Sequence, residues 1–304
     1  MSTHIAGLHS KYVPASKKLQ AIEDSVRRFF KRGPLVLIDV TTGRLCDRQA
    51  LPDLFKSDPT FKEPVSSMTN EIDKERIRKT VNKYFGYVMF SHVWGNGKEE
   101  EKSNEPSFAT VMNSDSIHRL PNTSMNNKLR NFCAKVAELG YRWAWSDTCC
   151  IDKSDNAILN RSIRSMYKWY EASEATLVYL ADVSSDRGDL LHSLWMTRAW
   201  TLQEALVPIC ILFYDRDWQL YRGVVTDNHK NPGVILQELA TATGVSSESL
   251  VSFIQNLSGY ARNYAWLRHV LQLSRKTLRI RSSVSSKATS FLCMVKEITR
   301  WAIF

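Results

Sequence analysis

Two kinds of hydrophobic spacing alternate along this chain, and together they predict both helices and strands. Apolar residues recur at helical intervals in residues 15–32 and again in residues 71–84, so we expect an amphipathic helix in each segment. A short apolar run at residues 35–40 predicts a strand between them. Residues 41–70 are rich in turn-forming residues and are expected to be irregular or weakly helical.

From residue 86 onward, short apolar runs alternate with helical patterns. The runs at 87–90, 141–145, 175–180 and 209–214 predict strands, and the segments at 126–139, 155–172 and 194–207 predict helices between them. Residues 95–125 have neither pattern and are expected to be a long loop. This order predicts an α/β fold, in which helices flank a parallel sheet.

The pattern divides the chain into three parts. Residues 1–84 are a helical and irregular lead-in, residues 85–220 an α/β core, and residues 221–304 a helical extension with a basic tail. Helical stretches are expected within residues 233–272. Residues 274–290 are rich in Ser, Arg and Lys with little periodicity, which is typical of disorder.

Composition indicates a soluble cytoplasmic protein. The formal net charge is +10, but from residue 261 onward there are nine Lys or Arg residues and one acid, so the basicity belongs to the tail. That distribution argues against nucleic-acid binding by the core. The longest apolar run, residues 206–214, is well short of the roughly 20 residues that span a bilayer, so we expect no membrane span. No apolar signal region precedes Lys17.

The six cysteines do not form a disulfide scaffold or a metal site by their spacing. No C-x-x-C pair occurs, and the neighbours Cys149 and Cys150 could bridge only with strain. We therefore expect reduced thiols and no bound metal.

Candidate chemistry begins where the strand at 87–90 ends. Ser91 and His92 would lie at the carboxyl edge of the sheet, where open α/β sheets bind ligands, and Trp94 follows them. His92 could polarise a ligand or relay a proton. The alternative is structural, because such polar residues also tie down loops without doing chemistry.

The second core strand is followed by two carboxylates and the cysteine pair. Asp147 and Asp152 could accept ribose hydroxyls or orient a base, or they could only stabilise turns. Cys150 could act as a nucleophile with His92 as its partner, although buried thiols usually only pack.

Trp200 and Glu204 are four residues apart on a predicted helix and should share one face. A carboxylate beside an indole is partly desolvated, which raises its pKa and suits acid/base chemistry. The alternative is a surface glutamate paired with a residue such as Arg198. If the strands pair as predicted, His92, the two aspartates and Glu204 should border one cavity.

Five blocks of sequence, in order, resemble the HET domain of fungal heterokaryon-incompatibility proteins. They are YVMFSHVWG at 87–95, GYRWAWSDTCCIDK at 140–153, SIRSMYKWYEAS at 162–173, TLVYLADVS at 176–184 and WMTRAWTLQEALVP at 195–208, followed by LFYDRDW at 212–218. The resemblance implies a cytoplasmic trigger of non-self recognition and programmed cell death. Three positions depart from the family, since Ile158 and Arg161 stand where acidic residues are usual and Ala199 where glycine is usual.

HET domains are in turn similar to TIR domains, which have a flavodoxin-like fold. TIR domains assemble with themselves or with adaptor domains, and some cleave NAD with a glutamate in a W-x-x-x-E spacing that Trp200 and Glu204 match. The resemblance therefore implies a self-associating death-effector module or, alternatively, an NAD nucleosidase with NAD as substrate and no bound cofactor. In the second case Glu204 would stabilise the developing ribosyl cation. The ligand-binding residues would be Ser91, His92, Trp94, Asp147, Cys150, Asp152 and Trp200.

Beyond Arg275-Lys276-Thr277 the family pattern ends. We hypothesise that the basic, serine-rich residues 278–304 come from a shifted reading frame or a misplaced splice junction.

Overall fold

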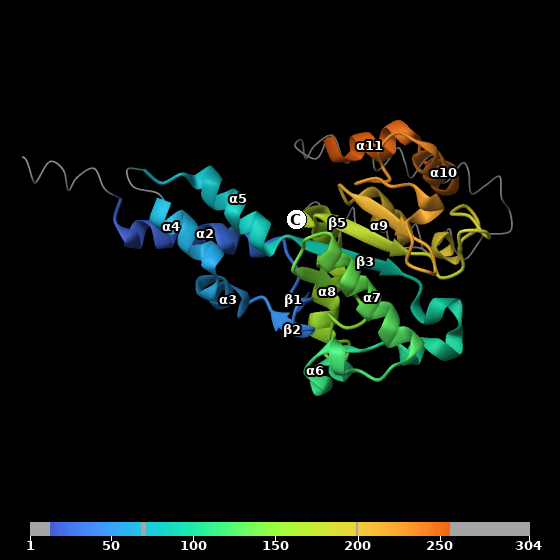
Figure 1. Ribbon diagram of the computed structural model, residues 1–304, viewed down its shortest axis with the longest axis horizontal. Helices are drawn as coiled ribbons and strands as arrows, with labels where there is room; N and C mark the ends of the chain where they lie inside the picture. Colours follow the sequence, from blue (N-terminus) through green and yellow to red (C-terminus); the bar gives the residue numbers. More distant parts are fainter. Residues whose placement is uncertain (1–12, 68–70, 199, 256–304) are drawn as a thin grey trace, which may run out of the picture.

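A six-stranded sheet forms the centre of the structure, which is a computed structural model describing residues 13–67, 71–198 and 200–255 (Figure 1). The strands lie in the order β2-β1-β4-β3-β5-β6. Their bounds are Val36–Asp39 (β1), Arg44–Asp47 (β2), Tyr87–His92 (β3), Trp143–Trp145 (β4), Ala175–Tyr179 (β5) and Ile211–Tyr214 (β6). The mixed α/β architecture with a mostly parallel sheet confirms the predicted fold class.

The four strands of the core are parallel, and β1 and β2 are an antiparallel addition at one edge. Across the sheet these four strands lie in the order β4-β3-β5-β6. The first core strand in the chain, β3, therefore lies between the second and the third, which is the strand order of flavodoxin-like folds. The chain passes from β3 to β4 on one side and from β5 to β6 on the other, so the direction of the connections reverses between β3 and β5. Doubly wound sheets bind ligands at the carboxyl ends of the strands at this point.

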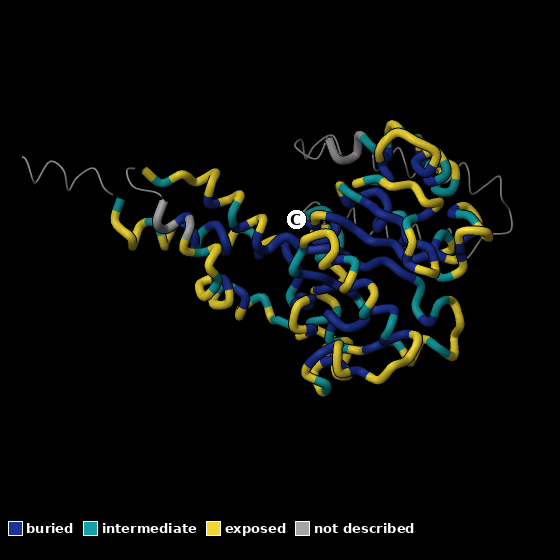
Figure 2. The backbone as a smooth tube through the Cα atoms, in the orientation of Figure 1, coloured by how far each residue is buried: buried dark blue, intermediate teal, exposed yellow. Residues whose placement is uncertain are grey.

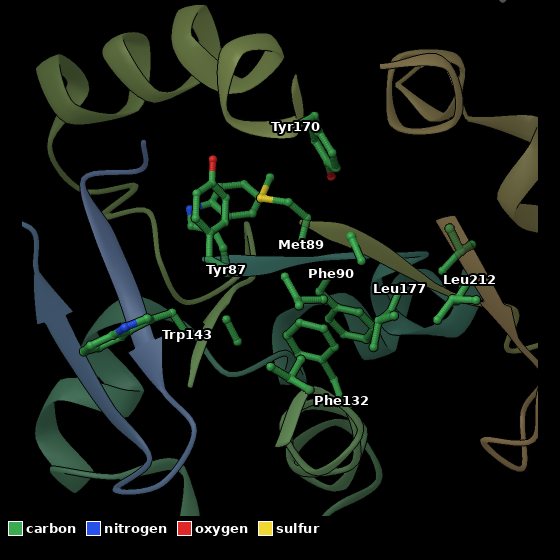
Figure 3. Packing of buried hydrophobic residues seen from close by; sticks show 14 of the residues in the cluster. Tyr87, Met89, Phe90, Phe132, Trp143, Tyr170, Leu177 and Leu212 are labelled. Atoms are coloured by element: carbon green, nitrogen blue, oxygen red, sulfur yellow. The ribbon is translucent and has the colours of Figure 1, made fainter. Parts of the chain in front are cut away.

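Helices cover both faces of the sheet. On one face, α7 (Ser124–Glu138) packs on β3 through the stacked rings of Phe90 and Phe132, whose centroids are 4.3 Å apart. On the other face lie α8 (Asn156–Ala172) and α9 (Thr201–Leu206), and the Tyr87 hydroxyl donates a hydrogen bond to the Trp169 carbonyl of α8 at 2.6 Å. Figure 3 shows Tyr87 and Tyr170 on one side of β3 and Phe132 on the other. Figure 2 shows the resulting buried band through the sheet.

The lead-in contributes to the sheet and also forms a helical lobe beside it (Figure 1). The lobe consists of α2 (Ala15–Phe30), α3 (Leu51–Ser57), α4 (Pro59–Ser67) and α5 (Lys74–Phe85), which confirms the two predicted amphipathic helices. The hairpin β1–β2 leaves this lobe, and β1 pairs with β4. The predicted division after residue 84 therefore cuts through the sheet. The strand β2 was not predicted.

Three local predictions are wrong. The expected loop at 95–125 contains η1 (Trp94–Gly97), η2 (Glu99–Asn104), α6 (Phe108–Ser114) and η3 (Ile117–Arg119). The helix expected at 126–139 begins two residues earlier, at Ser124, because the Thr123 hydroxyl caps α7 by accepting the Asn126 backbone N–H at 3.3 Å. The single helix expected at 194–207 is interrupted at Arg198, whose backbone is extended, so that η4 (Leu194–Thr197) precedes α9.

The C-terminal part contains η5 (Tyr221–Gly223), α10 (Val234–Thr243) and α11 (Ser247–Gln255), in agreement with the helices expected after residue 233. The part of the expected helical region after residue 255 and the predicted disordered or frame-shifted tail lie outside the described residues. Among the helices of the described ranges, none has the length and apolar character needed to cross a membrane.

The hairpin is fastened to the core by a charge pair. The Asp39 carboxylate, 3% exposed, accepts hydrogen bonds from Arg142 Nη2 at 2.8 Å and Nε at 3.2 Å.

We expect Asp39→Asn to lower the free energy of unfolding by about 1–3 kcal/mol, because a partly buried guanidinium loses its charged partner. Asp53→Asn, with a side chain 83% exposed, should change it by less than about 0.5 kcal/mol. Urea unfolding measures both, and equal losses would contradict this role for Asp39.

Candidate functional site

The carboxyl end of β3 carries two polar residues that point to opposite faces of the sheet. Successive side chains of a strand alternate between the faces. Ser91 faces α8 and α9, whereas the ring of His92 stacks on Phe90 on the α7 face, with centroids 4.2 Å apart. The expectation that His92 and Glu204 border one cavity is therefore wrong, because each belongs to a separate buried cluster.

The first group, here named the Ser91 cluster, consists of Ser91, Tyr170, Trp195 and Glu204. The Ser91 hydroxyl donates to Glu204 Oε2 at 2.5 Å and accepts from the Trp195 indole N–H at 2.7 Å. The Tyr170 hydroxyl also acts on Glu204 and lowers the pKa of its carboxyl group. Glu204 is 6% exposed, so its carboxyl group is enclosed by protein.

Burial has the largest effect on the pKa of Glu204. Desolvation raises the pKa of Glu204 above its usual value, and the charge of Arg198 and the hydrogen bonds of Ser91 and Tyr170 only partly oppose it. The alternative of a surface glutamate paired with Arg198 is wrong. The Arg198 guanidinium instead donates to the His92 carbonyl oxygen, which ties the turn before α9 to the end of β3.

The second group, the His92 cluster, consists of His92, Glu105 and Lys128. Lys128 of α7 forms an ion pair with Glu105, and both side chains are buried. The Gly95 backbone N–H donates to the same carboxylate at 2.9 Å, so the pair also holds the η1 turn. His92 Nε2 lies 3.7 Å from Glu105 Oε1, which is too long for a hydrogen bond.

His92 is a neutral ring in a charged environment. Burial lowers the pKa of His92, and the neighbouring Lys128 lowers it further. Neither ring nitrogen has a hydrogen-bond partner among the described residues. Burial opposes ionisation of Glu105, but His92 and Lys128 outweigh it and lower the pKa of Glu105 to about 2. At neutral pH the cluster therefore contains one ion pair and one uncharged imidazole.

Sequence reasoning missed Glu105 and Lys128. A signal for Lys128 was present, because it lies between Met125 and Leu129 on the apolar stripe of α7, where a lysine requires a buried anion. Glu105 had no comparable signal, since it lies in the segment expected to be a loop.

A third group lies at the sheet edge and is more accessible. The Trp94 indole N–H donates to Asp147 Oδ2 at 3.0 Å, and Lys153 Nζ lies 3.9 Å from the centre of the Trp94 ring. Asp147 and Trp94 are half-buried. The charge of Asp147 raises the pKa values of both His92 and Glu204. A carboxylate, an indole and an ammonium at a strand end could together face a polar ligand.

The remaining candidates have structural contacts of their own. Asp152 accepts hydrogen bonds from the Ser154 N–H at 3.0 Å and the Ser154 hydroxyl at 2.6 Å, as expected from its alternative role in a turn. Cys150 accepts from the Ser146 N–H at 3.4 Å, and burial raises the pKa of Cys150 well above its usual value, so the thiol is protonated. Half-buried Trp200 precedes α9, and its carbonyl accepts the Glu204 N–H at 3.2 Å.

A metal centre has no support in the described ranges, where no cluster of three His, Cys, Asp or Glu residues could hold an ion.

Comparison with known proteins finds similarity over the segment that carries the His92 cluster and part of the Ser91 cluster. Residues 87–193 match the model of a family described as heterokaryon incompatibility protein (HET). The chain is 36% identical over 142 residues to the vegetative incompatibility protein HET-E-1 of Podospora anserina, an alignment that covers 43% of this chain and 10% of that protein. The chain thus spans about a tenth of the length of this curated relative. No solved structure matches. The family match ends before Glu204.

Because Glu204 is buried, its contribution to the stability of the fold should fall as the pH rises. A paired surface carboxylate would show the opposite dependence. A carboxyl group whose pKa is raised by folding stabilises the fold fully below its unfolded value, about 4.5, and this contribution is lost as the pH rises through the folded value. Glu204→Gln should therefore gain stability relative to the wild type as the pH rises from 5 to 8. The gain should be about 1.4 kcal/mol for every pH unit that separates the folded pKa of Glu204 from its unfolded pKa.

Urea unfolding at several pH values measures this difference. Exposed Glu100→Gln is the matched control and should track the wild type. A Glu204→Gln variant that loses stability relative to the wild type as the pH rises would mean that Glu204 is ionised and paired in the fold.

Proposed function

We propose that this protein acts in heterokaryon incompatibility, the response to non-self after cells fuse, because residues 87–193 match the HET family model. The observation that carries the proposal is the family match over the core of the sheet, which includes β3, β4 and β5. The relative with the matching segment is itself a vegetative incompatibility protein. Since the chain spans only a tenth of that protein, the proposal concerns the HET domain and not the remainder of the relative.

The proposed mode of action is association, as a death-effector module that assembles with a second copy or with another HET or adaptor protein. The geometry favours this mode because three of the candidate catalytic or ligand-binding residues are held in structural contacts or are chemically inert. Glu204 is enclosed by Ser91 and Tyr170, Asp152 holds a turn, and the Cys150 thiol is protonated. A module of this kind needs a stable scaffold and an accessible surface, and it needs no open catalytic cavity.

NAD cleavage is the second candidate, and one observation favours it. Glu204 is a buried carboxyl with a raised pKa, located beside β3, at the edge where flavodoxin-like sheets bind ligands. Catalysis would require Glu204 to break its contact with Ser91 and become accessible to the ribose. It would also proceed without His92, which faces the other side of the sheet. These requirements make hydrolysis the weaker proposal.

The role in incompatibility is tested by forced heterokaryons between two otherwise compatible strains of a filamentous fungus, one of which expresses the chain. We expect the yield of viable heterokaryons to fall sharply. The control is Leu177→Asp, which places an unpaired charge at a fully buried position of β5 and should abolish folding and the effect. An unchanged yield with folded, abundant protein would contradict the proposal.

The mode of action is tested on the purified full chain by sedimentation velocity and by nicotinamide release from NAD. Association predicts a concentration-dependent rise in sedimentation coefficient and the same nicotinamide background for the wild type and Glu204→Gln. Release that exceeds background and drops at least about 100-fold in Glu204→Gln, but not in Glu100→Gln, would select the hydrolase instead.

A further inference from the structure

A cavity of about 410 Å³ lies in the helical lobe, outside the segment that matches the HET family. Residues of α2, α3 and α4 line it, and its volume falls within the range of small-molecule sites. Its interior is apolar and partly aromatic. The apolar lining residues are Ile22, Val26, Phe30, Pro52, Phe55 and Phe61. The rings of Phe55 and Phe61 meet edge to face at 5.2 Å, which gives this wall a defined shape.

The rim of the cavity is strongly cationic. Four basic side chains line it, namely Arg27, Lys31, Arg48 and Lys56, against a single acid, Glu23. Lys56 Nζ is 3.2 Å from Glu23 Oε1, so this one acid is already paired. Within the described ranges, neither Arg27 nor Lys31 has an ion-pair partner.

Arg48 adds a further positive charge at the inner edge. Its Nη1 donates to the Phe30 carbonyl oxygen at 3.1 Å, which holds the guanidinium against the end of α2. Burial lowers the pKa of Arg48, the charge of Arg161 on α8 lowers it further, and Asp47 opposes both effects. Because the basic residues of the lining outnumber the acidic ones, a bound anion would be attracted to this edge.

An occupant that complements this lining has an apolar part for the interior and a negative charge for the rim.

We propose that the cavity binds an anionic amphiphile, a molecule with a hydrocarbon tail and a single carboxylate or phosphate head. The tail lies against Val26, Phe55 and Phe61, and the head is held by Arg27, Lys31 and Arg48. This binding site is separate from the proposed function and does not depend on it.

The test uses the purified full chain and cis-parinaric acid, a fatty acid whose fluorescence rises in apolar sites. Its methyl ester, which keeps the tail and lacks the charge, is the paired probe. The acid should bind at least about fivefold more tightly than the ester, and this preference should shrink at high salt. Displacement by dodecanoic acid and by monododecyl phosphate then distinguishes a carboxylate head from a phosphate head.

Two charge reversals on α2 and its C-terminal end provide the matched comparison. Exposed Lys31→Glu lies on the rim and should weaken binding of the acid about five- to tenfold without changing binding of the ester. Exposed Arg28→Glu adds the same charge outside the lining and should bind both probes like the wild type. Thermal unfolding confirms that each variant is folded. Absent binding, equal affinity for acid and ester, or equal effects of the two reversals would overturn the proposal.

Discussion

The structure depends on the burial of β3 on both faces. All six residues of this strand are buried, because β4 and β5 lie on either side and helices cover the faces above and below. A polar side chain on such a strand is enclosed by protein on its own face, where an unpaired polar group is costly. Ser91 therefore requires Glu204, 113 positions later, and His92 lies against the Glu105–Lys128 pair on the other face. Both clusters follow from two adjacent polar residues at the end of one central strand.

This arrangement bears on how residues 87–193, the segment that matches the family model, can work. The residues with the chemistry of a catalytic site are those that join α7, α8 and α9 to β3, so their polarity serves the fold. The accessible polar group is the one at the edge, where Asp147, Trp94 and Lys153 meet. Recognition by surface contact fits this distribution better than chemistry in an enclosed cavity. The cationic cavity of the helical lobe, for which we proposed an anionic amphiphile, lies outside the matched segment.

Many of the helices and strands could be predicted, because the spacing of apolar residues and the capping residues lie within each element itself. The helix at 156–172 carries its cap, Asp155, and an apolar stripe in one short segment. The strand β2 escaped prediction because Arg44–Asp47 is short and mixed in polarity. Within the site, alternation along β3 already separates Ser91 from His92. The pairing of Glu105 with Lys128 could not be predicted, since it depends on how the η1–η2 segment folds back over α7.

A double-mutant cycle on the free energy of unfolding tests the separation of the two clusters most directly. Ser91→Ala combined with Glu204→Gln should show a coupling of at least about 1 kcal/mol, because the two side chains share a buried hydrogen bond. Ser91→Ala combined with Lys128→Met should be additive within about 0.5 kcal/mol, because the sheet lies between them. Comparable coupling in both cycles, or none between Ser91 and Glu204, would contradict the account.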